Sequence, residues 1–217
     1  MFSSTCAVYG APKKIPIPEN HLQAPLNPYG HSKRMVEQLL ADSAAAHGVR
    51  SVSLRYFNAA GANPEGEIGE AHDPETHLIP LVLEVAASLR PSLRIHGTDY
   101  ATRDGTCIRD YVHVSDLADA RVLALRYLAK HAGTAAFNLG NGAAFTVREV
   151  IAAAERVTGR KIPVRVGPRR PGDPPALVSN ASLARRKLGW KPRHWDLESM
   201  IATAGRWLQS PMQAPDR

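Results

Sequence analysis

Tyr29 and Lys33 are the first residues of this sequence whose types and spacing could do chemistry. They fall in a predicted helix that has Asn27 as its N-cap and Pro28 at its first helical position, and that runs to about Gly48. Residues four apart on a helix lie on one face, so the ammonium and the phenol are predicted neighbours. A neighbouring ammonium favours the phenolate and lowers its pKa, which makes an acid/base catalyst usable near neutral pH. Ordinary surface helices show the same spacing, so the catalytic interpretation depends on the other segments.

Two predicted strands must bring further polar side chains to that helix. Residues 1–10 are typical of a short strand ending in a polar loop, and residues 49–57 alternate as a strand that ends at Asn58. Strand, helix and strand in this order predict a parallel sheet with right-handed crossovers. Ligands of open α/β sheets bind beyond the carboxyl ends of the strands, so a Thr5 hydroxyl there could bond a substrate hydroxyl and the Tyr29 oxygen.

The rest of the chain alternates between short strands, helices and loops. Helices are predicted at residues 78–89, 115–131, 146–158 and around Trp190 and Trp207; extended segments at 93–97, 106–114, 137–140 and 164–166; and loops at 11–27, 62–77, 98–105 and 168–175. Thr146 and Glu149 have the spacing of a capping box, and Ser115 is the predicted cap of its helix.

Composition indicates a globular protein with one large domain or two small ones. Of the 217 residues, 44% are hydrophobic, which is enough for a buried core. The longest apolar stretch, residues 78–89, is interrupted by Glu84 and is too short to cross a membrane, so no membrane partner is expected. Cys6 and Cys107 lie far apart, which predicts a reduced, cytoplasmic setting without disulfides or a zinc site.

The net charge of +7 could suggest nucleic acid. The basic residues are scattered, however, and are not interleaved with aromatic side chains that would stack on bases. Anionic small molecules account for some of these residues and a solvated surface for the others, so no nucleic-acid partner is expected.

Six segments, taken in order along nearly the whole chain, carry a resemblance to a known family. They are FSSTCAVYG at 2–10, NPYGHSK at 27–33, LRYFNAAG at 54–61, GTDY at 97–100 continuing to DGTCIRDYVHV at 104–114, FNLG at 137–140 and RRPGD at 169–173. With Thr5, Tyr29 and Lys33 in the places of a Ser/Thr-Tyr-Lys triad, the chain closely resembles the extended short-chain dehydrogenase/reductase superfamily. Within that superfamily it is similar to the UDP-glucose 4-epimerase family.

The resemblance implies an α/β fold that comprises the C-terminal part of a Rossmann-like parallel sheet plus a smaller α/β substrate-binding domain. Residues 1–61, with return segments near 108–140, would be the late strands and catalytic helix of the NAD-binding domain. Residues 62–217 would mainly form the UDP-sugar-binding domain. Full-length relatives of this kind are homodimers that pair through the catalytic helix and its neighbour.

The resemblance also implies a reaction, the inversion of C4 in UDP-glucose or UDP-galactose with bound NAD as a reversible hydride store. Tyr29 would take the proton of the sugar 4-hydroxyl while Thr5 orients that hydroxyl. Lys33 would lower the Tyr29 pKa and hold the nicotinamide ribose. Ser3 and Tyr56 would complete the cofactor side.

Five further residues would hold the substrate if the resemblance extends to them. Arg109 and Arg170 would grip the pyrophosphate as fixed guanidinium forks. Asp173 would accept hydrogen bonds from the uridine ribose, Asn58 would meet a phosphate, and Leu78 would line the uridine side.

Four of these residues also have a plainer interpretation from the sequence. Arg109 and Asp110 could pair across a strand end, and Asn58 could be a turn residue. Arg170 and Asp173 could be solvated in a Pro/Gly-rich loop.

Two other patterns suggest sites but have weak support. His72 and His77, with Asp73 and Glu75 nearby, lie in a predicted loop without tight ligand spacing, so no metal site is predicted. A partial phosphate-loop pattern, Gly-x-Gly at 140–142, is explained by the capping box that follows it.

Two positions bear on which sugar chemistry the chain would support. Related dehydratases place an Asp-Glu pair directly after the triad Ser/Thr, whereas Cys6 and Ala7 offer no acid here, which favours epimerisation. Leu177, at the family's position for sugar size, is neither bulky nor very small. UDP-N-acetylhexosamine, UDP-pentose and UDP-glucuronate therefore stay open as substrates of a 4-epimerase.

A glycine-rich turn is the one expected feature that the sequence lacks. A dinucleotide fold begins with a strand, such a turn and a helix, yet neither GxGxxG nor GxxGxxG occurs in these residues. We therefore expect an N-terminally truncated chain with weak NAD affinity and an exposed sheet edge. Two functions stay open: a UDP-sugar 4-epimerase, and an inactive remnant that at most binds UDP-sugars through Arg109, Arg170 and Asp173.

Overall fold

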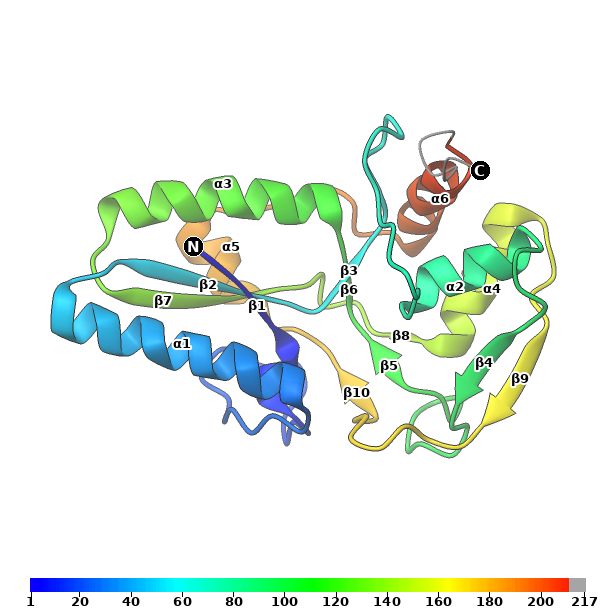
Figure 1. The fold of residues 1–217 in the computed structure, drawn as a ribbon, viewed down its shortest axis with the longest axis horizontal. Helices are drawn as coiled ribbons and strands as arrows, with labels where there is room; N and C mark the ends of the chain where they lie inside the picture. The colour runs from blue at the N-terminus through cyan, green and yellow to red at the C-terminus, as the bar shows by residue number, and fades with distance from the viewer. Residues whose placement is uncertain (211–217) are drawn as a thin grey trace.

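Three parallel strands form the centre of the first half of the molecule. The computed structural model describes residues 1–210. Strands β1 (Phe2–Thr5), β2 (Ser51–Tyr56) and β7 (Thr134–Leu139) pair in the order β1-β2-β7, with Thr5 beside Tyr56 and Tyr56 beside Leu139. Helix α1 (Pro28–His47) covers one face of this sheet and α3 (Val114–Lys130) the other (Figure 1). This arrangement confirms the predicted α/β class with parallel strands.

Helix α1 begins and ends where local chemistry dictates. The Asn27 side chain accepts a hydrogen bond from the Gly30 N–H, Pro28 occupies the first turn, and Gly48 closes the helix in the left-handed conformation. The predicted bounds are therefore confirmed. The polar loop expected after β1 begins instead as a 3-10 turn, η1 (Cys6–Tyr9), which Thr5 caps.

The second half packs three helices beside a two-stranded sheet. Helices α2 (Leu78–Ala86), α4 (Val147–Thr158) and α6 (Leu197–Leu208) share a buried cluster with β4 (Leu93–His96), which pairs in parallel with β9 (Val164–Gly167). The capping box is confirmed, because Thr146 and Glu149 each bond the other's backbone N–H.

Short strands join the two halves (Figure 1). Strand β3 (Asn58–Ala60) pairs in parallel with β6 (Tyr111–His113), and β5 (Ile108–Arg109) lies between β10 (Ala176–Leu177) and β8 (Phe145–Thr146). The remaining helix, α5 (Ser182–Leu188), packs on β7 and α3, and Trp190 after it is buried in the cluster of the first sheet. The boundary at residue 61 stays a prediction, and the last residues of the predicted second region, 211–217, lie outside the described part.

One predicted cap is wrong. Ser115 does not cap α3, because the His113 side chain occupies that place and accepts a hydrogen bond from the Ser115 N–H at 3.1 Å. Among residues 1–210, no helix is both long and apolar enough to cross a membrane.

Candidate active site

The first turn of α1 faces the carboxyl ends of β1 and β2 across a cavity of about 750 Å³. Its wall includes Thr5 from β1, Tyr29 from α1, Tyr56 from β2 and Asn58 from β3. The Tyr29 side chain is 55% exposed, so the phenol is open to a ligand. Two of the three predicted catalytic residues, Thr5 and Tyr29, therefore line one cavity, as expected for ligands beyond strand ends.

Lys33 and Ser3 are not among the described residues that line this cavity. The Lys33 Nζ donates a hydrogen bond to the Ser3 carbonyl oxygen at 2.9 Å and lies 5.6 Å from the centre of the Tyr29 ring. Thr5 Oγ1 accepts a hydrogen bond from the Ala7 N–H at 3.1 Å, so its own proton can be donated into the cavity.

A buried ion pair fixes helix α1 on the sheet. Glu37, one turn beyond Lys33 on α1, receives two hydrogen bonds from Arg55 of β2, at 2.6 and 3.0 Å, and one from Ser4 of β1 at 2.5 Å. Burial acts to raise the pKa of Glu37, but the hydrogen bonds and charge of Arg55 outweigh it and hold the pKa below its usual value. A forked, nearly dry contact of this kind resists rotation and sliding of α1.

Tyr56 is held from two sides at the edge of the cavity. Its hydroxyl lies 3.3 Å from Ser3 Oγ and accepts a hydrogen bond from Arg121 Nε of α3 at 3.0 Å. Both predicted cofactor-side residues of the strands are thus in contact with each other.

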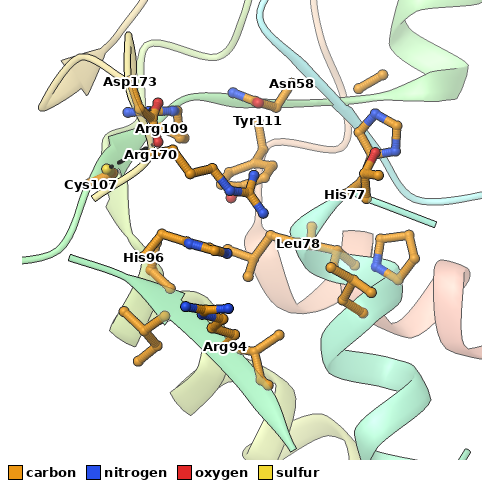
Figure 2. A pocket seen from close by; sticks show the side chains of 18 residues that line it. Asn58, His77, Leu78, Arg94, His96, Cys107, Arg109, Tyr111, Arg170 and Asp173 are labelled. Atoms are coloured by element: carbon orange, nitrogen blue, oxygen red, sulfur yellow. Dashed lines mark hydrogen bonds and ion pairs between the residues drawn. The ribbon is translucent and has the colours of Figure 1, made fainter. Parts of the chain in front are cut away.

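A second cavity, of about 280 Å³, lies beside the first and is basic. Figure 2 shows side chains from β3, α2, β4, β5 and the loop after β9 gathered around it. All five predicted substrate residues line it: Asn58, Leu78, Arg109, Arg170 and Asp173. Asn58 and His77 line both cavities, so the two are adjacent.

Arg109 pairs with Asp173 in this cavity, and not with its neighbour Asp110. Asp110 instead is fully buried and accepts hydrogen bonds from Asn141 N, Gly142 N, Ser179 N and Ser179 Oγ at 2.5–3.0 Å. Burial raises the pKa of Asp110 to about 6, although these donors favour its charged form. The plainer interpretation of Arg109 is therefore wrong.

The Gly-x-Gly pattern at 140–142 wraps a carboxylate of the protein itself. A Cβ on Gly140 would lie 2.4 Å from Asp110 Oδ2, which explains why glycine stands there. The pattern therefore has a structural explanation in addition to the capping box.

Several lining residues escaped the sequence analysis. Arg94 and His96 alternate along β4 with Leu93 and Ile95, which are buried in the core, so that alternation was the available signal. Burial, followed by the positive charge of Arg170 and Arg94, holds the pKa of His96 below its usual value. Three arginines (Arg94, Arg109 and Arg170) make the cavity suited to an anion.

Leu177 lies outside the residues that line either cavity. It is buried on β10 in a small cluster with Cys6 and Phe57, which do line the larger cavity. The predicted influence of this position on sugar size stays a prediction.

Comparisons with known proteins agree with this geometry. The family model described as "NAD dependent epimerase/dehydratase family" matches residues 1–140. The UDP-glucose 4-epimerase of Lacticaseibacillus casei is 51% identical over 210 residues, which is 97% of this chain and 63% of that protein. The chain thus spans less than two thirds of the length of this curated relative.

Two solved structures are similar as well. UDP-glucose 4-epimerase from Brucella ovis, in complex with NAD, is 51% identical with a TM-score of 0.89, over 94% of this chain and 63% of that one. The enzyme from Bifidobacterium longum, in complex with NAD+ and UDP, is 40% identical with a TM-score of 0.92, over 98% and 64% of the two chains. With a family model matching more than half of its residues, this chain belongs to the NAD dependent epimerase/dehydratase family.

Proposed function

We propose that the protein is a UDP-glucose/UDP-galactose 4-epimerase, which inverts C4 of a UDP-hexose with NAD as its cofactor. The observation that carries this proposal is the open phenol of Tyr29 in a cavity that shares Asn58 with an adjacent basic cavity. A nucleotide sugar needs both places, because its sugar must meet the acid/base group while its pyrophosphate meets cations. The likeness to UDP-glucose 4-epimerases supports the same assignment.

The basic cavity would hold the UDP part of the substrate. Arg109 and Arg170 offer guanidinium forks to the two phosphates, and Leu78 offers an apolar contact. Asp173 already holds Arg109 before a ligand enters, so one fork is preorganised, and the other oxygen of Asp173, which accepts from the Cys107 thiol, has lone-pair capacity left for a ribose hydroxyl.

The described residues fit one end of NAD. The phenol of Tyr29, the ammonium of Lys33 and the hydroxyls of Ser3 and Tyr56 gather at the ends of two neighbouring parallel strands, where a nicotinamide ribose would find donors and acceptors. The sequence offers no glycine-rich turn for the pyrophosphate of the cofactor. When bound, NAD supplies the reversible hydride acceptor that an epimerase needs.

The chain's own groups would then handle the proton. Tyr29 Oη accepts the proton of the sugar 4-hydroxyl and later returns it to the same oxygen, while Thr5 Oγ1 donates to that oxygen and orients it. Lys33, held by the Ser3 carbonyl, places its amine near the phenol. Cys6 and Ala7 on the same wall carry no acid, which favours epimerisation over loss of water.

The finer substrate choice is part of this proposal. UDP-glucose and UDP-galactose come first, and UDP-N-acetylhexosamine, UDP-pentose and UDP-glucuronate are the alternatives. We also propose a cytoplasmic protein, because both cysteines are free and buried, and a homodimer. Met35 and Leu39, exposed one turn apart on α1, are the apolar surface that supports dimerisation.

The decisive experiment measures interconversion of UDP-galactose and UDP-glucose with added NAD, together with UDP binding by calorimetry. Tyr29→Phe should remove at least 99% of the turnover, because the loss of an acid/base group lowers the rate by at least ~100-fold. UDP affinity should stay unchanged. Tyr127→Phe, on α3 and stacked on His131, is the matched control and should keep full activity.

Two results would redirect the assignment. Full activity of Tyr29→Phe contradicts the catalytic role of this phenol. UDP binding without turnover of any of the four sugar classes supports the second candidate, a protein that binds UDP-sugars without converting them.

A further inference from the structure

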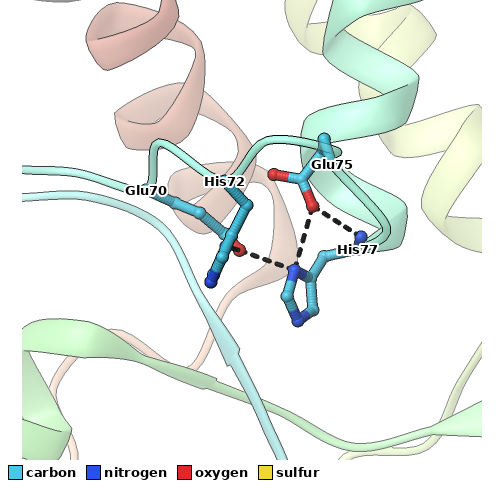
Figure 3. Close-up of side chains that lie close together, drawn as sticks. All are labelled: Glu70, His72, Glu75 and His77. Carbon is cyan, nitrogen blue, oxygen red and sulfur yellow. Dashed lines mark hydrogen bonds and ion pairs between the residues drawn. The ribbon is translucent and has the colours of Figure 1, made fainter.

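The loop between β3 and α2, residues 61–77, gathers four metal-ligating side chains at one point. They are Glu70, His72, Glu75 and His77, and one ligand atom from each lies within 4.8 Å of all the others. Figure 3 shows dashed lines from the carboxylates of Glu70 and Glu75 converging on one nitrogen of the His77 ring. Asp73, which the sequence also suggested, is not a member.

Both imidazoles turn the same ring nitrogen to one carboxylate oxygen. His72 Nδ1 and His77 Nδ1 each lie 2.6 Å from Glu70 Oε1, and His77 Nδ1 lies 2.9 Å from Glu75 Oε1. Neutral imidazole nitrogens and carboxylate oxygens are the donors of a zinc site. Tetrahedral zinc with bonds of ~2.0–2.2 Å needs ligand atoms about 3.3 Å apart. The three nitrogen–oxygen contacts of 2.6–2.9 Å are shorter than this, and all four ligand atoms lie within 4.8 Å of one another, so small side-chain movements would admit the ion.

The charge of the loop as a whole points in the same direction. It carries five carboxylates (Glu65, Glu67, Glu70, Asp73 and Glu75) and no lysine or arginine, in a chain whose net charge is +7. A cation is therefore drawn to this loop by the local field, against the charge of the molecule as a whole.

The burial of the four side chains suits a metal that closes a loop. Glu75 is 7% exposed, and its carboxylate already accepts the Thr76 and His77 N–H groups, so its position is fixed. His72 and His77 are 61% and 54% exposed, which leaves the site open to entering ions.

We propose that Glu70, His72, Glu75 and His77 bind one zinc-type divalent ion, which fastens the 61–77 loop. A mixed set of two nitrogens and two oxygens favours Zn²⁺ over Mg²⁺ or Ca²⁺, which prefer oxygen alone. Glu70, His72 and His77 also line the larger cavity, so the ion would stiffen one wall of the candidate active site. The ion has no part in the proposed epimerisation.

The test titrates ZnCl₂ into the untagged 217-residue chain after removal of metal with EDTA, by calorimetry in a buffer that does not chelate. We expect one Zn²⁺ per chain and no saturable binding of Mg²⁺. His72→Ala and Glu70→Gln should each weaken the affinity at least about tenfold, because each removes a ligand.

Asp73→Asn and His47→Ala are the matched controls. The first removes a carboxylate of the same loop outside the cluster, and the second an exposed imidazole on α1, so both should bind zinc as the unchanged chain does. Thermal melting of each apo variant checks that it is folded.

A spectroscopic readout separates this site from loose surface binding. Co²⁺ in place of Zn²⁺ should give the intense visible bands of tetrahedral coordination, and these bands should be lost in His72→Ala. Absence of saturable zinc binding, or equal weakening in Asp73→Asn, overturns the proposal and leaves a cluster held by protons on the imidazoles.

Discussion

His113 is a fully buried imidazole that acts as a neutral hydrogen-bond acceptor. Its Nδ1 accepts the Ser115 N–H at the start of α3, so the proton resides on Nε2, which donates to Thr203 Oγ1 at 3.1 Å. Thr203 Oγ1 in turn donates to the Met200 carbonyl oxygen. Protonation at Nδ1 would set two donors against each other, so this residue must stay uncharged.

The pKa of His113 follows from its surroundings. Burial lowers it from its ordinary value of 6.5 to about 4, the stacked ring of His194 acts in the same direction, and the charge of Asp116 opposes them. Because the folded-state pKa is depressed, this contribution to stability is complete above pH 6.5 and is lost as the pH falls toward 4.

We predict that the free energy of unfolding falls as the pH is lowered from 6.5 to 4, with His113 contributing about 3 kcal/mol of the loss. Urea titrations at several pH values measure it. In His113→Gln, which has no ring proton to gain, the decrease over this interval should be smaller by that amount. Equal decreases in both proteins would show that His113 titrates normally.

At the level of elements, the close approach of α1 to η1 sets the direction of α1. A Cβ on Gly30, the residue after Tyr29, would lie 2.6 Å from the Ala7 carbonyl oxygen and 2.9 Å from Pro25 Cβ. Only hydrogen fits there without moving backbone. The first turn of α1 therefore rests directly on the turn that follows Thr5.

Gly30→Ala should destabilise the protein by about 1–3 kcal/mol through overpacking against backbone, measured by urea unfolding. Gly205→Ala on α6 is the matched control, because its Cβ would lie at an ordinary 3.6 Å from Leu83 Cδ2. The control should be neutral or more stable by up to about 1 kcal/mol, owing to the better helix propensity of alanine. Similar losses in both variants would show that helix propensity, and not the contact with Ala7, decides the result.

For the whole molecule, the basic cavity matters because side chains from both halves line it. Asn58 and Arg109 come from the short strands between them, Leu78 from α2, and Asp173 from the loop after β9. A ligand that contacts all of these binds the folded chain only, and stabilises it by mass action.

UDP at a hundred times its dissociation constant should raise the melting temperature by roughly 5–10 °C. Arg109→Ala should abolish the shift, since it removes a phosphate donor and leaves Asp173 without its ion-pair partner. Arg103→Ala removes an exposed arginine that pairs with Glu149 outside the cavity, and should keep the shift. A shift of equal size in Arg109→Ala would place UDP elsewhere.

Sequence alone determined the features that depend on neighbours within one or two turns of chain. The start of α1, the common face of Tyr29 and Lys33, and the capping box of α4 follow from side chains that bond the nearest backbone groups. The parallel class of the sheet follows from the order of strand and helix patterns, because a crossover helix leaves no other simple pairing.

Tertiary structure decided the features that join distant segments. Arg109 pairs with Asp173, 64 residues away, and not with its neighbour Asp110, because successive side chains of an extended segment point to opposite faces. Along β4, Arg94 and His96 alternate in the same way with the core residues Leu93 and Ile95, and both line the cavity. His113, and not the predicted Ser115, caps α3, and its ring is held by Thr203, which lies 90 residues further along the chain. Local sequence patterns do not predict such partners, because only folding of the whole chain brings them together.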